Sequence, residues 1–518
     1  MQFGMLVAVV PFLARLAALF GSVSALVVLT AVYAPSPSID LVGKEQNVVF
    51  AVQNLLAEHA LYRDPAQPPF VATQYSPLCY LLPFAIAKML GLRPEDVSEI
   101  YLVGRLISTA ITVGSCLIVF GILSRFTRLG RVTRLAIAFL LPLVINPWSF
   151  LVRPDAIYLF FAAAAFWAAL HYAELPRSRS LLISTVLLLL AFYSKQTALL
   201  LFPLPFIMAL AHGGWRALNP KHLALAALVY GGGAAGIFAI PFMVENFTAS
   251  LGNGIDMRWT LGTVDGPFIL DHLPLLLFSL LAFREATAGD DWRPRAVGLA
   301  TVWLLIVALV TSLKWGSDVN YFDEFVLGCL LLCGMAPSLT DHETKPQPRL
   351  PGLIFLVLLL TQQALSAYLA RPFIWQALKP RDEMYADGRA LANDAQLRGQ
   401  LIMVFDFSSS LVFIPDRAAF APIENIGTSA ANGFFDLTPV KQAIHEGRLC
   451  FAVTSASVGA HVRSERPPDY AWIAFLDREL LSDFDSSRRI GDKVVLTSDR
   501  CRASLIPAAQ SLTSTPIP

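Results

Sequence analysis

Long apolar segments recur along most of this chain and restrict its fold more than any other feature. About eleven runs have the apolar character of membrane-crossing helices, most of them roughly 17 to 25 residues long and two of them shorter. Hydrophobic residues make up 55% of the 518 residues, and this is more apolar sequence than a water-soluble core can bury. The sequence therefore predicts a polytopic α-helical membrane protein. Its spans are expected near residues 12–34, 101–124, 133–151, 155–173, 180–194, 197–212, 223–243, 266–283, 296–313, 321–337 and 350–368.

Basic residues gather in alternate connections between these runs, which should face the cytoplasm by the positive-inside rule. The first run is interpreted as a retained span with a cytoplasmic N-terminus, because no clear cleavage site follows it. Everything after residue 368 is then expected on the outer side of the membrane. The net charge of +1 gives no sign of a nucleic-acid partner. The basic residues of these connections are Arg125, Arg128, Arg131, Arg134, Arg177, Arg179, Arg216, Lys221, Arg284, Arg293, Arg295, Lys345 and Arg349.

The membrane pattern ends near residue 368, and the remainder predicts an α/β domain over 369–508 with a disordered tail at 509–518. Helices are expected near 382–397 and 437–446, and strands at 400–406, 411–414, 449–453, 472–476 and 493–497. Cys450 and Cys501 both lie in this domain. An oxidising compartment permits a disulfide between them, and two free thiols are the alternative.

The first outer loop, residues 35–100, has the densest group of polar residues between two spans and is expected to lie on the periplasmic side. Apolar residues at helical spacing over 45–59 predict an amphipathic helix on the membrane surface, and 76–91 predicts a second interfacial helix. Glu45 shares a face with the apolar stripe, so its carboxylate should point toward the membrane boundary. The alternative is an ordinary first-turn acid favoured by the helix dipole.

A set of motifs in this order resembles the bacterial membrane glycosyltransferases of the GT-C superfamily, which includes protein mannosyltransferases and aminoarabinose transferases. The motifs are GKEQNVVFAVQNLLAEHALYRD, QYSPLCYLLPFAIAKMLG and GRLIS, then RPD at 153–155, SKQTALL at 194–200, KWGSDVNYFDEF at 314–325 and NGFFDLTPVKQAIHEGR in the last domain. The resemblance covers nearly the whole chain. It implies a catalytic domain over 1–368 and a donor in which a sugar is attached to a polyprenyl phosphate.

The resemblance also implies a catalytic carboxylate in the first outer loop, often within a pair of acids. Here Lys44 precedes Glu45, so the pair is not intact, and Asp40 lies five residues before Glu45. Glu45 is the first candidate for the general base of an inverting transfer, and Asp40 is the second. A carboxylate near the acceptor takes its proton as the nucleophile attacks the anomeric carbon.

The phosphate that leaves such a donor requires positive charge at its oxygens. Cations at the predicted outer ends of the spans are Lys195, Arg153, Arg258 and Lys314, of which Lys195 resembles the phosphate-binding lysine of the superfamily. Each is also compatible with an interfacial cation that binds nothing. Candidates for substrate binding are Asp155, Tyr75, Asn320 and Tyr321, with helix-terminal pairing of Asp155 and interfacial anchoring of Tyr321 as the alternatives.

The main alternative function is a transporter or flippase for a lipid-linked or envelope substrate, and a non-catalytic assembly protein is a further one. Transporters place ionisable residues near the bilayer midplane, whereas charges in this sequence gather toward the outer face. The acceptor is open among lipids, glycans and proteins. A divalent cation is compatible with the acids, but no cluster of His or Cys residues requires a metal.

Overall fold

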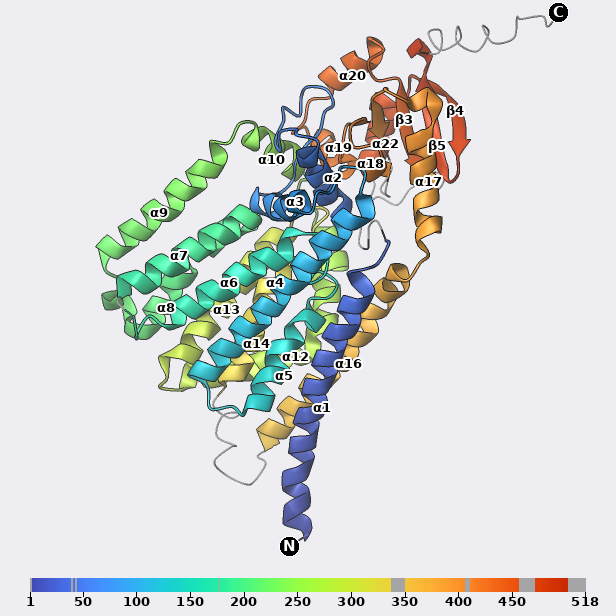
Figure 1. The fold of residues 1–518 in the computed structure, drawn as a ribbon. Helices are drawn as coiled ribbons and strands as arrows, with labels where there is room; N and C mark the ends of the chain where they lie inside the picture. The colour runs from blue at the N-terminus through green and yellow to red at the C-terminus, as the bar shows by residue number, and fades with distance from the viewer. Residues whose placement is uncertain are drawn as a thin grey trace, which may run out of the picture.

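The structure is a computed structural model that describes residues 2–38, 41, 44–175, 177–336, 350–405, 410–455 and 471–501. These residues form a bundle of membrane helices below a smaller domain that contains a sheet (Figure 1). Two helices of the first outer loop, α2 (Glu45–Leu56) and α3 (Leu78–Met89), lie between the bundle and that domain (Figure 1). The predicted tail, 509–518, lies outside the described residues.

Each of the predicted apolar segments contains a helix. By length and composition, the described part of the chain has eight candidate membrane spans, with the run Gln196–Arg216 counted as one. Because α5, α6 and α14 are shorter, the total of eleven crossings stays a prediction. The helices are α1 (Gln2–Tyr33), α4 (Val97–Phe126), α5 (Arg131–Val144), α6 (Pro154–Leu170), α7 (Arg177–Ser194), α8 (Leu204–Gly213), α9 (Pro220–Phe238), α12 (Gly266–Ala288), α13 (Trp292–Ser312), α14 (Asp323–Met335) and α16 (Leu350–Ala377).

Several short helices connect these spans on the side of the smaller domain. The turn after α7 continues as η1 (Gln196–Leu201), and the connection between α9 and α12 contains α10 (Met243–Leu251), α11 (Met257–Trp259) and η3 (Thr260–Asp265). The single turn η4 (Val319–Phe322) leads directly into α14. At the other end of the bundle, away from the smaller domain, the loop between α8 and α9 contains η2 (Gly214–Ala217) (Figure 1).

The connection from α5 to α6 is irregular backbone buried at one end of the bundle. The predicted span 133–151 is too long, because α5 ends at Val144 and α6 begins at Pro154. Proline suits the first turn of a helix, where no intrahelical partner for its nitrogen is needed. Hydroxyl groups of α4 donate to backbone carbonyls of this non-helical segment. Ser108 donates to Leu151 O at 2.6 Å, and Thr112 donates to Ser149 O at 2.9 Å. Buried non-helical backbone is tolerated where such partners exist.

Helix α2 is present, but the prediction that it lies on the membrane surface is wrong. Every residue from Glu45 to Asn54 is buried, including the amide side chains that were expected to face water. Gln53 Nε2 donates to Pro94 O at 2.6 Å and to Val412 O at 2.8 Å, so the polar face packs beneath the C-terminal domain. Protein rather than solvent therefore covers both faces of this amphipathic helix.

The C-terminal domain contains a mixed five-stranded sheet with the order β2-β1-β3-β5-β4. Strand β1 pairs parallel with β2 and β3, whereas β5 pairs antiparallel with β3 and β4. The strands are β1 (Ile402–Val404), β2 (Ala418–Ala419), β3 (Phe451–Ser455), β4 (Phe484–Ile490) and β5 (Lys493–Ser498). The helices are α17 (Arg381–Asn393), η6 (Ala395–Leu397), α18 (Ser410–Phe413), α19 (Ile423–Ala431), α20 (Thr438–His445) and α22 (Ala471–Leu480).

Two of the five predicted strands are helices in the structure. Residues 411–413 of the predicted strand 411–414 lie in α18, and residues 472–476 lie in α22, while the sequence interpretation missed β2 and β4. A short apolar run has the same composition in a buried helix and a buried strand, so periodicity alone does not separate them. The predicted domain boundary at residue 368 also falls inside α16, which continues to Ala377.

The first outer loop is attached to the C-terminal domain by backbone hydrogen bonds. Phe420 N donates to Pro69 O at 2.8 Å, and Ala72 N donates to Ala421 O at 2.9 Å. Val71 forms a parallel bridge with Ala421. The loop that was expected to contain the chemistry is therefore enclosed between the membrane helices and the domain.

A disulfide joins Cys450 and Cys501, whose Cα atoms are 5.6 Å apart. It links the start of β3 to the end of the described chain. Of the two alternatives that the sequence left open, the structure has the bridge. Cys79, Cys116, Cys329 and Cys333 are buried free thiols.

We expect Cys501→Ser to lower the stability of the C-terminal domain by about 4 kcal/mol, the chain-entropy value for a bond that closes a loop of this length. The two cysteines are separated by 51 residues. Thermal unfolding of the full-length protein in detergent measures the loss. Alkylation of the denatured wild-type protein should add two more groups after reduction than before it, and an unchanged mass would contradict the bridge. Cys329→Ala is the control that keeps the mass difference.

Candidate active site

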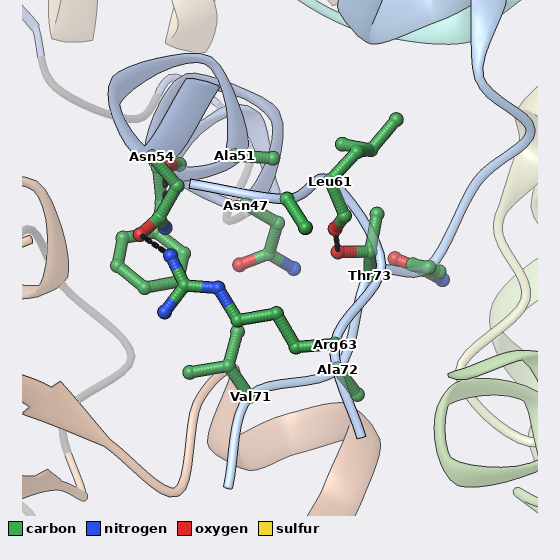
Figure 2. Close-up of a pocket in the computed structure, with 11 residues that line it drawn as sticks. Asn47, Ala51, Asn54, Leu61, Arg63, Val71, Ala72 and Thr73 are labelled. Atoms are coloured by element: carbon green, nitrogen blue, oxygen red, sulfur yellow. Dashed lines mark hydrogen bonds between the residues drawn. The ribbon is translucent and has the colours of Figure 1, made fainter. Parts of the chain in front are cut away.

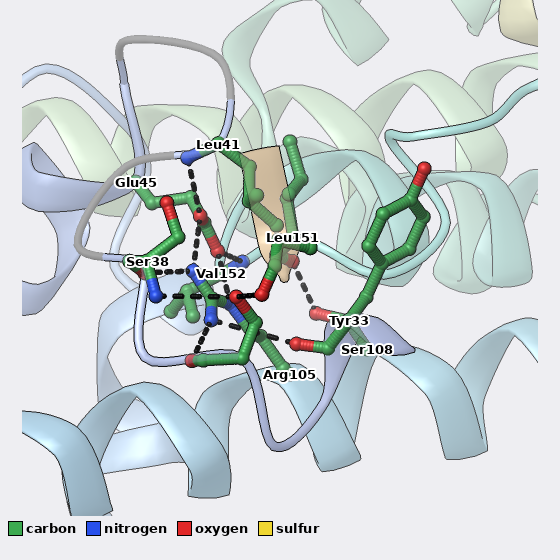
Figure 3. A network of polar contacts seen from close by, with 10 residues as sticks. Tyr33, Ser38, Leu41, Glu45, Arg105, Ser108, Leu151 and Val152 are labelled. Atoms are coloured by element: carbon green, nitrogen blue, oxygen red, sulfur yellow. Dashed lines mark hydrogen bonds and ion pairs between the residues drawn. The ribbon is translucent and has the colours of Figure 1, made fainter. Parts of the chain in front are cut away.

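A buried ion pair between Glu45 and Arg105 joins the first outer loop to the membrane helices (Figure 3). Arg105 Nη2 lies 2.7 Å from Glu45 Oε2, and Arg105 Nε donates to Glu45 Oε1 at 3.0 Å. Leu41 N and Val152 N also donate to the two carboxylate oxygens, at 3.2 and 2.9 Å. Both side chains have no exposed surface. The carboxylate is thus surrounded by four donors.

This environment gives Glu45 a structural role and disfavours the predicted role as general base. A base needs an approach for the acceptor hydroxyl, and here both oxygens are enclosed and bonded. The predicted direction of the Glu45 side chain is wrong, because it points toward α4 and the turn before α6 instead of the membrane boundary. No role was predicted for Arg105 from the sequence, although an ionisable residue inside an apolar span is itself a sign of structural or functional importance.

Arg105 also organises the backbone that precedes α2. Its guanidinium donates to Ser36 O at 2.7 Å and to Ser38 O at 2.6 Å. The described residues on both sides of Asp40, Ser38 and Leu41, are therefore held by the same ion pair. Asp40 itself lies outside the described residues.

A second buried cluster forms around Asp155, at the start of α6. Lys195 Nζ lies 2.8 Å from Asp155 Oδ1, and Arg153 Nε lies 3.0 Å from Asp155 Oδ2. Asn320 Nδ2 donates to Asp155 Oδ1 at 2.6 Å. These four residues come from three separated segments and are all buried. Two cations with one carboxylate leave an excess of positive charge among the four side chains.

Aromatic rings surround the two cations of this cluster. Lys195 Nζ is 4.9 Å from the ring centre of Tyr321 and 5.3 Å from that of Tyr158. Arg153 Cζ is 4.4 Å from the ring centre of Trp148. Rings at these distances stabilise a cation by its attraction to their π-electrons. They also fix the side chains without occupying the hydrogen-bond donors that a ligand would need.

Several polar atoms in and beside the cluster are buried and have no hydrogen-bond partner among the described residues: Arg153 Nη1, Asn320 Oδ1, Asp323 Oδ2 and Glu324 Oε1. Leaving a buried polar group without a partner costs free energy comparable to a lost hydrogen bond. A group of such atoms in one place indicates a site that a polar ligand or water completes.

The C-terminal domain contributes to the wall of this site through the start of α19. Asn425 Nδ2 donates to Gln74 Oε1 at 3.1 Å, and Gln196 Nε2, next to Lys195, donates to Gln74 O at 3.3 Å. Lys44 Nζ donates to Gly316 O at 3.0 Å and lies 3.5 Å from Glu424 Oε1. Sequence analysis assigned no role to Glu424 or Asn425, because nothing in a single sequence indicates that this segment meets the first outer loop.

The structure brings most of the predicted site residues together. Tyr75 is buried and interacts electrostatically with Arg153 and Asp155, so it lies at this cluster. Lys314 lies beside Lys44 and Glu424, and burial together with the charge of Lys44 lowers the pKa of Lys314 to about 7. Glu45 and Arg258 are the exceptions among the described residues. Glu45 lies in the separate ion pair with Arg105, and Arg258 is exposed, with its backbone N–H donating to Asp256 Oδ1 at 2.9 Å.

Two cavities differ greatly in size, and of the two only the smaller is lined by the first outer loop. The pocket between α2 and residues 60–74 is lined by Asn54, Arg63 and Thr73, among others, and has a volume of about 10 Å³ (Figure 2). Arg63 Nη2 donates to Asn54 Oδ1 across it at 3.2 Å. It has room for a single water molecule at most. A larger cavity of about 180 Å³ lies beside Trp148 and Asp323.

The described residues contain no group of three or more His, Cys, Asp or Glu side chains arranged to hold a metal ion. The Asp155 carboxylate is instead partnered by Lys195, Arg153 and Asn320. Side chains of the protein therefore balance the charge of this carboxylate.

Comparison with known proteins identifies the fold. The family model described as dolichyl-phosphate-mannose-protein mannosyltransferase matches residues 83–231. No curated protein matches the chain by sequence. ArnT from Cupriavidus metallidurans bound to undecaprenyl phosphate has a TM-score of 0.55 at 12% identity, covering 92% of this chain and 97% of that one. The apo form of that ArnT has a TM-score of 0.53 at 14% identity, with coverage of 93% and 97%.

An oligosaccharyltransferase from Archaeoglobus fulgidus, solved in complex with zinc and sulfate, is also similar. Its TM-score is 0.53 at 13% identity, covering 84% of this chain and 68% of that one. The class of protein is thus a polytopic membrane protein built on the fold of membrane glycosyltransferases. The fold that the resemblance implied is therefore confirmed, and the family model supports it over residues 83–231.

Proposed function

We propose that this protein transfers a sugar from a polyprenyl-phosphate-linked donor to an acceptor in the bacterial cell envelope, at the periplasmic face of the inner membrane. The observation that carries the proposal is the buried cluster of Arg153, Lys195, Asp155 and Asn320 between the span ends and the C-terminal domain. The family model covers three of these residues. The ArnT whose fold is similar was solved with undecaprenyl phosphate bound.

The cluster suits the binding of a leaving phosphate. Lys195 has three ammonium hydrogens and uses one on Asp155, while Arg153 Nη1 has no partner among the described residues. Asp155 holds the two cations side by side and Asn320 holds Asp155. Donors fixed in advance stabilise charge that develops on the phosphate oxygens as the bond to the sugar breaks.

The proposed reaction is a single displacement with inversion. An acceptor hydroxyl or amine attacks the anomeric carbon, the bond from that carbon to the phosphate oxygen breaks, and a carboxylate takes the proton of the nucleophile. The phosphate keeps the electron pair and leaves as polyprenyl phosphate. The acceptor class is open among lipid, glycan and protein, and none of these steps requires a metal.

We assign the base to an acid other than Glu45, and Asp40 remains the sequence-based candidate. Glu45 and Arg105 hold the backbone on both sides of Asp40, which is the arrangement expected if the ion pair positions a catalytic loop. Lys44 stands at the position where the superfamily often has the other acid of the pair. It forms an ion pair with Glu424 of the C-terminal domain.

We expect Asp40→Asn to abolish glycan transfer while the thermal unfolding of the protein stays unchanged. Glu45→Gln should lower both the rate of glycan transfer and the thermal stability, because it removes the negative partner of a buried arginine. Transfer is measured in membranes supplied with a radiolabelled lipid-linked sugar. Glu58→Gln, in the same loop, is the control that should retain activity. Full activity of both Asp40→Asn and Glu45→Gln would reject the transferase proposal.

The transporter alternative has less support. Arg153 caps the start of α6 and Lys195 follows the end of α7, so the charged cluster lies at helix ends rather than in the middle of the spans. A substrate pathway through the membrane would be expected to place its ionisable residues near the midplane.

A further inference from the structure

A cavity of about 180 Å³ lies between the end of α5, the start of α14 and the helices α12 and α16. At about 30 Å³ for each molecule of liquid water, it has room for roughly six waters, or for one pyranose ring. Its wall combines aromatic rings, including Trp148 and Phe268, with the carboxylates of Asp271, Asp318 and Asp323. Flat rings and carboxylates together fit a ligand that has both an apolar face and several hydroxyl groups.

Three polar atoms on lining residues are without a hydrogen-bond partner in the described part of the chain. Trp148 Nε1 is a donor, Asn146 Oδ1 and Asp323 Oδ2 are acceptors, and Trp148 and Asp323 are more than nine-tenths buried. A hydroxyl group donates and accepts, so a ring with several hydroxyls satisfies these atoms at once. A hydrocarbon chain in the same place would leave all three unsatisfied.

The cavity adjoins the cation cluster. Trp148 is one wall of the cavity, and Arg153 Cζ lies 4.4 Å from the centre of its ring. Asp323 and Asp318 both interact electrostatically with Arg153. A phosphate held by Arg153 would therefore have a group attached to it within reach of the cavity.

We propose that this cavity holds the sugar ring of the donor, and that its wall selects against acidic sugars. The assignment rests on the proposed function, because it places the phosphate of the donor at Arg153 and Lys195. Three aspartates line the cavity, and the lining residues that the structure describes include no lysine or arginine. A neutral sugar or an amino sugar would meet acceptors for its hydrogens. The carboxylate of a uronic acid would instead face the aspartates, while Arg153 is already engaged by Asp155 and the donor phosphate, which disfavours its binding.

Binding of three lipids to the full-length wild-type protein in nanodiscs tests this inference without any variant. The probes are undecaprenyl phosphate, undecaprenyl phosphate glucose and undecaprenyl phosphate glucuronate. We expect the neutral sugar to tighten binding about 10-fold relative to the plain lipid phosphate, as a few satisfied buried hydrogen bonds would. The acidic sugar should bind at least about 10-fold more weakly than the neutral one. Equal affinities for the two sugar lipids would overturn the inference.

Two variants test whether the sugar binds in this cavity. Leu369→Trp, on α16, places a large ring in the cavity and should abolish the gain from the neutral sugar while affinity for plain undecaprenyl phosphate is unchanged. Asp323→Asn should reduce the discrimination between neutral and acidic sugar. If Leu369→Trp retains the full gain, the sugar binds elsewhere. Failure of the proposed function has a different signature: wild-type protein would not bind undecaprenyl phosphate, or Lys195→Met would not weaken that binding.

Discussion

Replacing Lys195 with methionine is expected to reduce glycan transfer about 100-fold or more, the scale seen when one fixed donor to a developing oxyanion is removed. Methionine keeps an apolar stem but removes the ammonium group, which lies beside Asp155 and near the rings of Tyr158 and Tyr321. Affinity for undecaprenyl phosphate should fall as well. The measurements are initial rates with a lipid-linked sugar and equilibrium binding of the lipid phosphate to purified protein.

Arg258→Gln is the matched control for this experiment. Arg258 was also predicted from the sequence to bind phosphate, but the structure leaves it exposed and apart from the cluster. We expect a change of less than about two-fold, as for most surface substitutions. If Lys195→Met and Arg258→Gln have equal effects, the buried cluster does not bind the donor phosphate.

Replacing Arg105 with methionine is expected to destabilise the protein by about 3–5 kcal/mol, because it leaves the carboxylate of Glu45 buried without a counterion. Both side chains of this pair have no exposed surface, so solvent screening does not weaken the effect. Thermal unfolding in detergent and the yield of folded protein measure the loss. Arg125→Gln is the control. The side chain of Arg125 is 63% exposed, so its ion pair with Glu174 should contribute only about 0–1 kcal/mol to stability.

The double substitution Glu45→Leu with Arg105→Met should not restore stability. Removing both charges ends the electrostatic penalty, but the pair also satisfies backbone groups of four residues. These are Ser36 O, Ser38 O, Leu41 N and Val152 N. Recovery of wild-type stability in the double variant would contradict the view that this ion pair organises the first outer loop.

Part of the site was predictable because local sequence determined it. Lys195 falls at a break between two apolar runs, and Arg153 and Asp155 lie on either side of the proline at which a span begins. Charged side chains at the ends of apolar helices are unusual enough to identify as candidates without any tertiary information. The structure places these three residues in one cluster and adds Asn320 from a segment 165 residues away from Asp155.

The roles of the two acids could not be predicted in the same way. Glu45 has the sequence context of a catalytic acid, yet its contacts are with Arg105 of α4 and Val152 before α6. Helical periodicity places a side chain on one face of its own helix, but it does not state what lies opposite that face. The surface position predicted for α2 failed for the same reason, since the C-terminal domain covers its polar side.

The sequence by itself determined the membrane class of this protein, the helical character of its apolar segments, the change to a small α/β domain and the cations at the span ends. These properties depend on composition and on periodicity within short windows, where the hydrophobic effect acts on neighbouring residues. Only the tertiary structure decided that Glu45 pairs with Arg105, that Lys195 and Arg153 share Asp155, and that α19 closes the site. Each of these contacts joins segments far apart in the chain, and the packing of the helices and the C-terminal domain determines which residues meet.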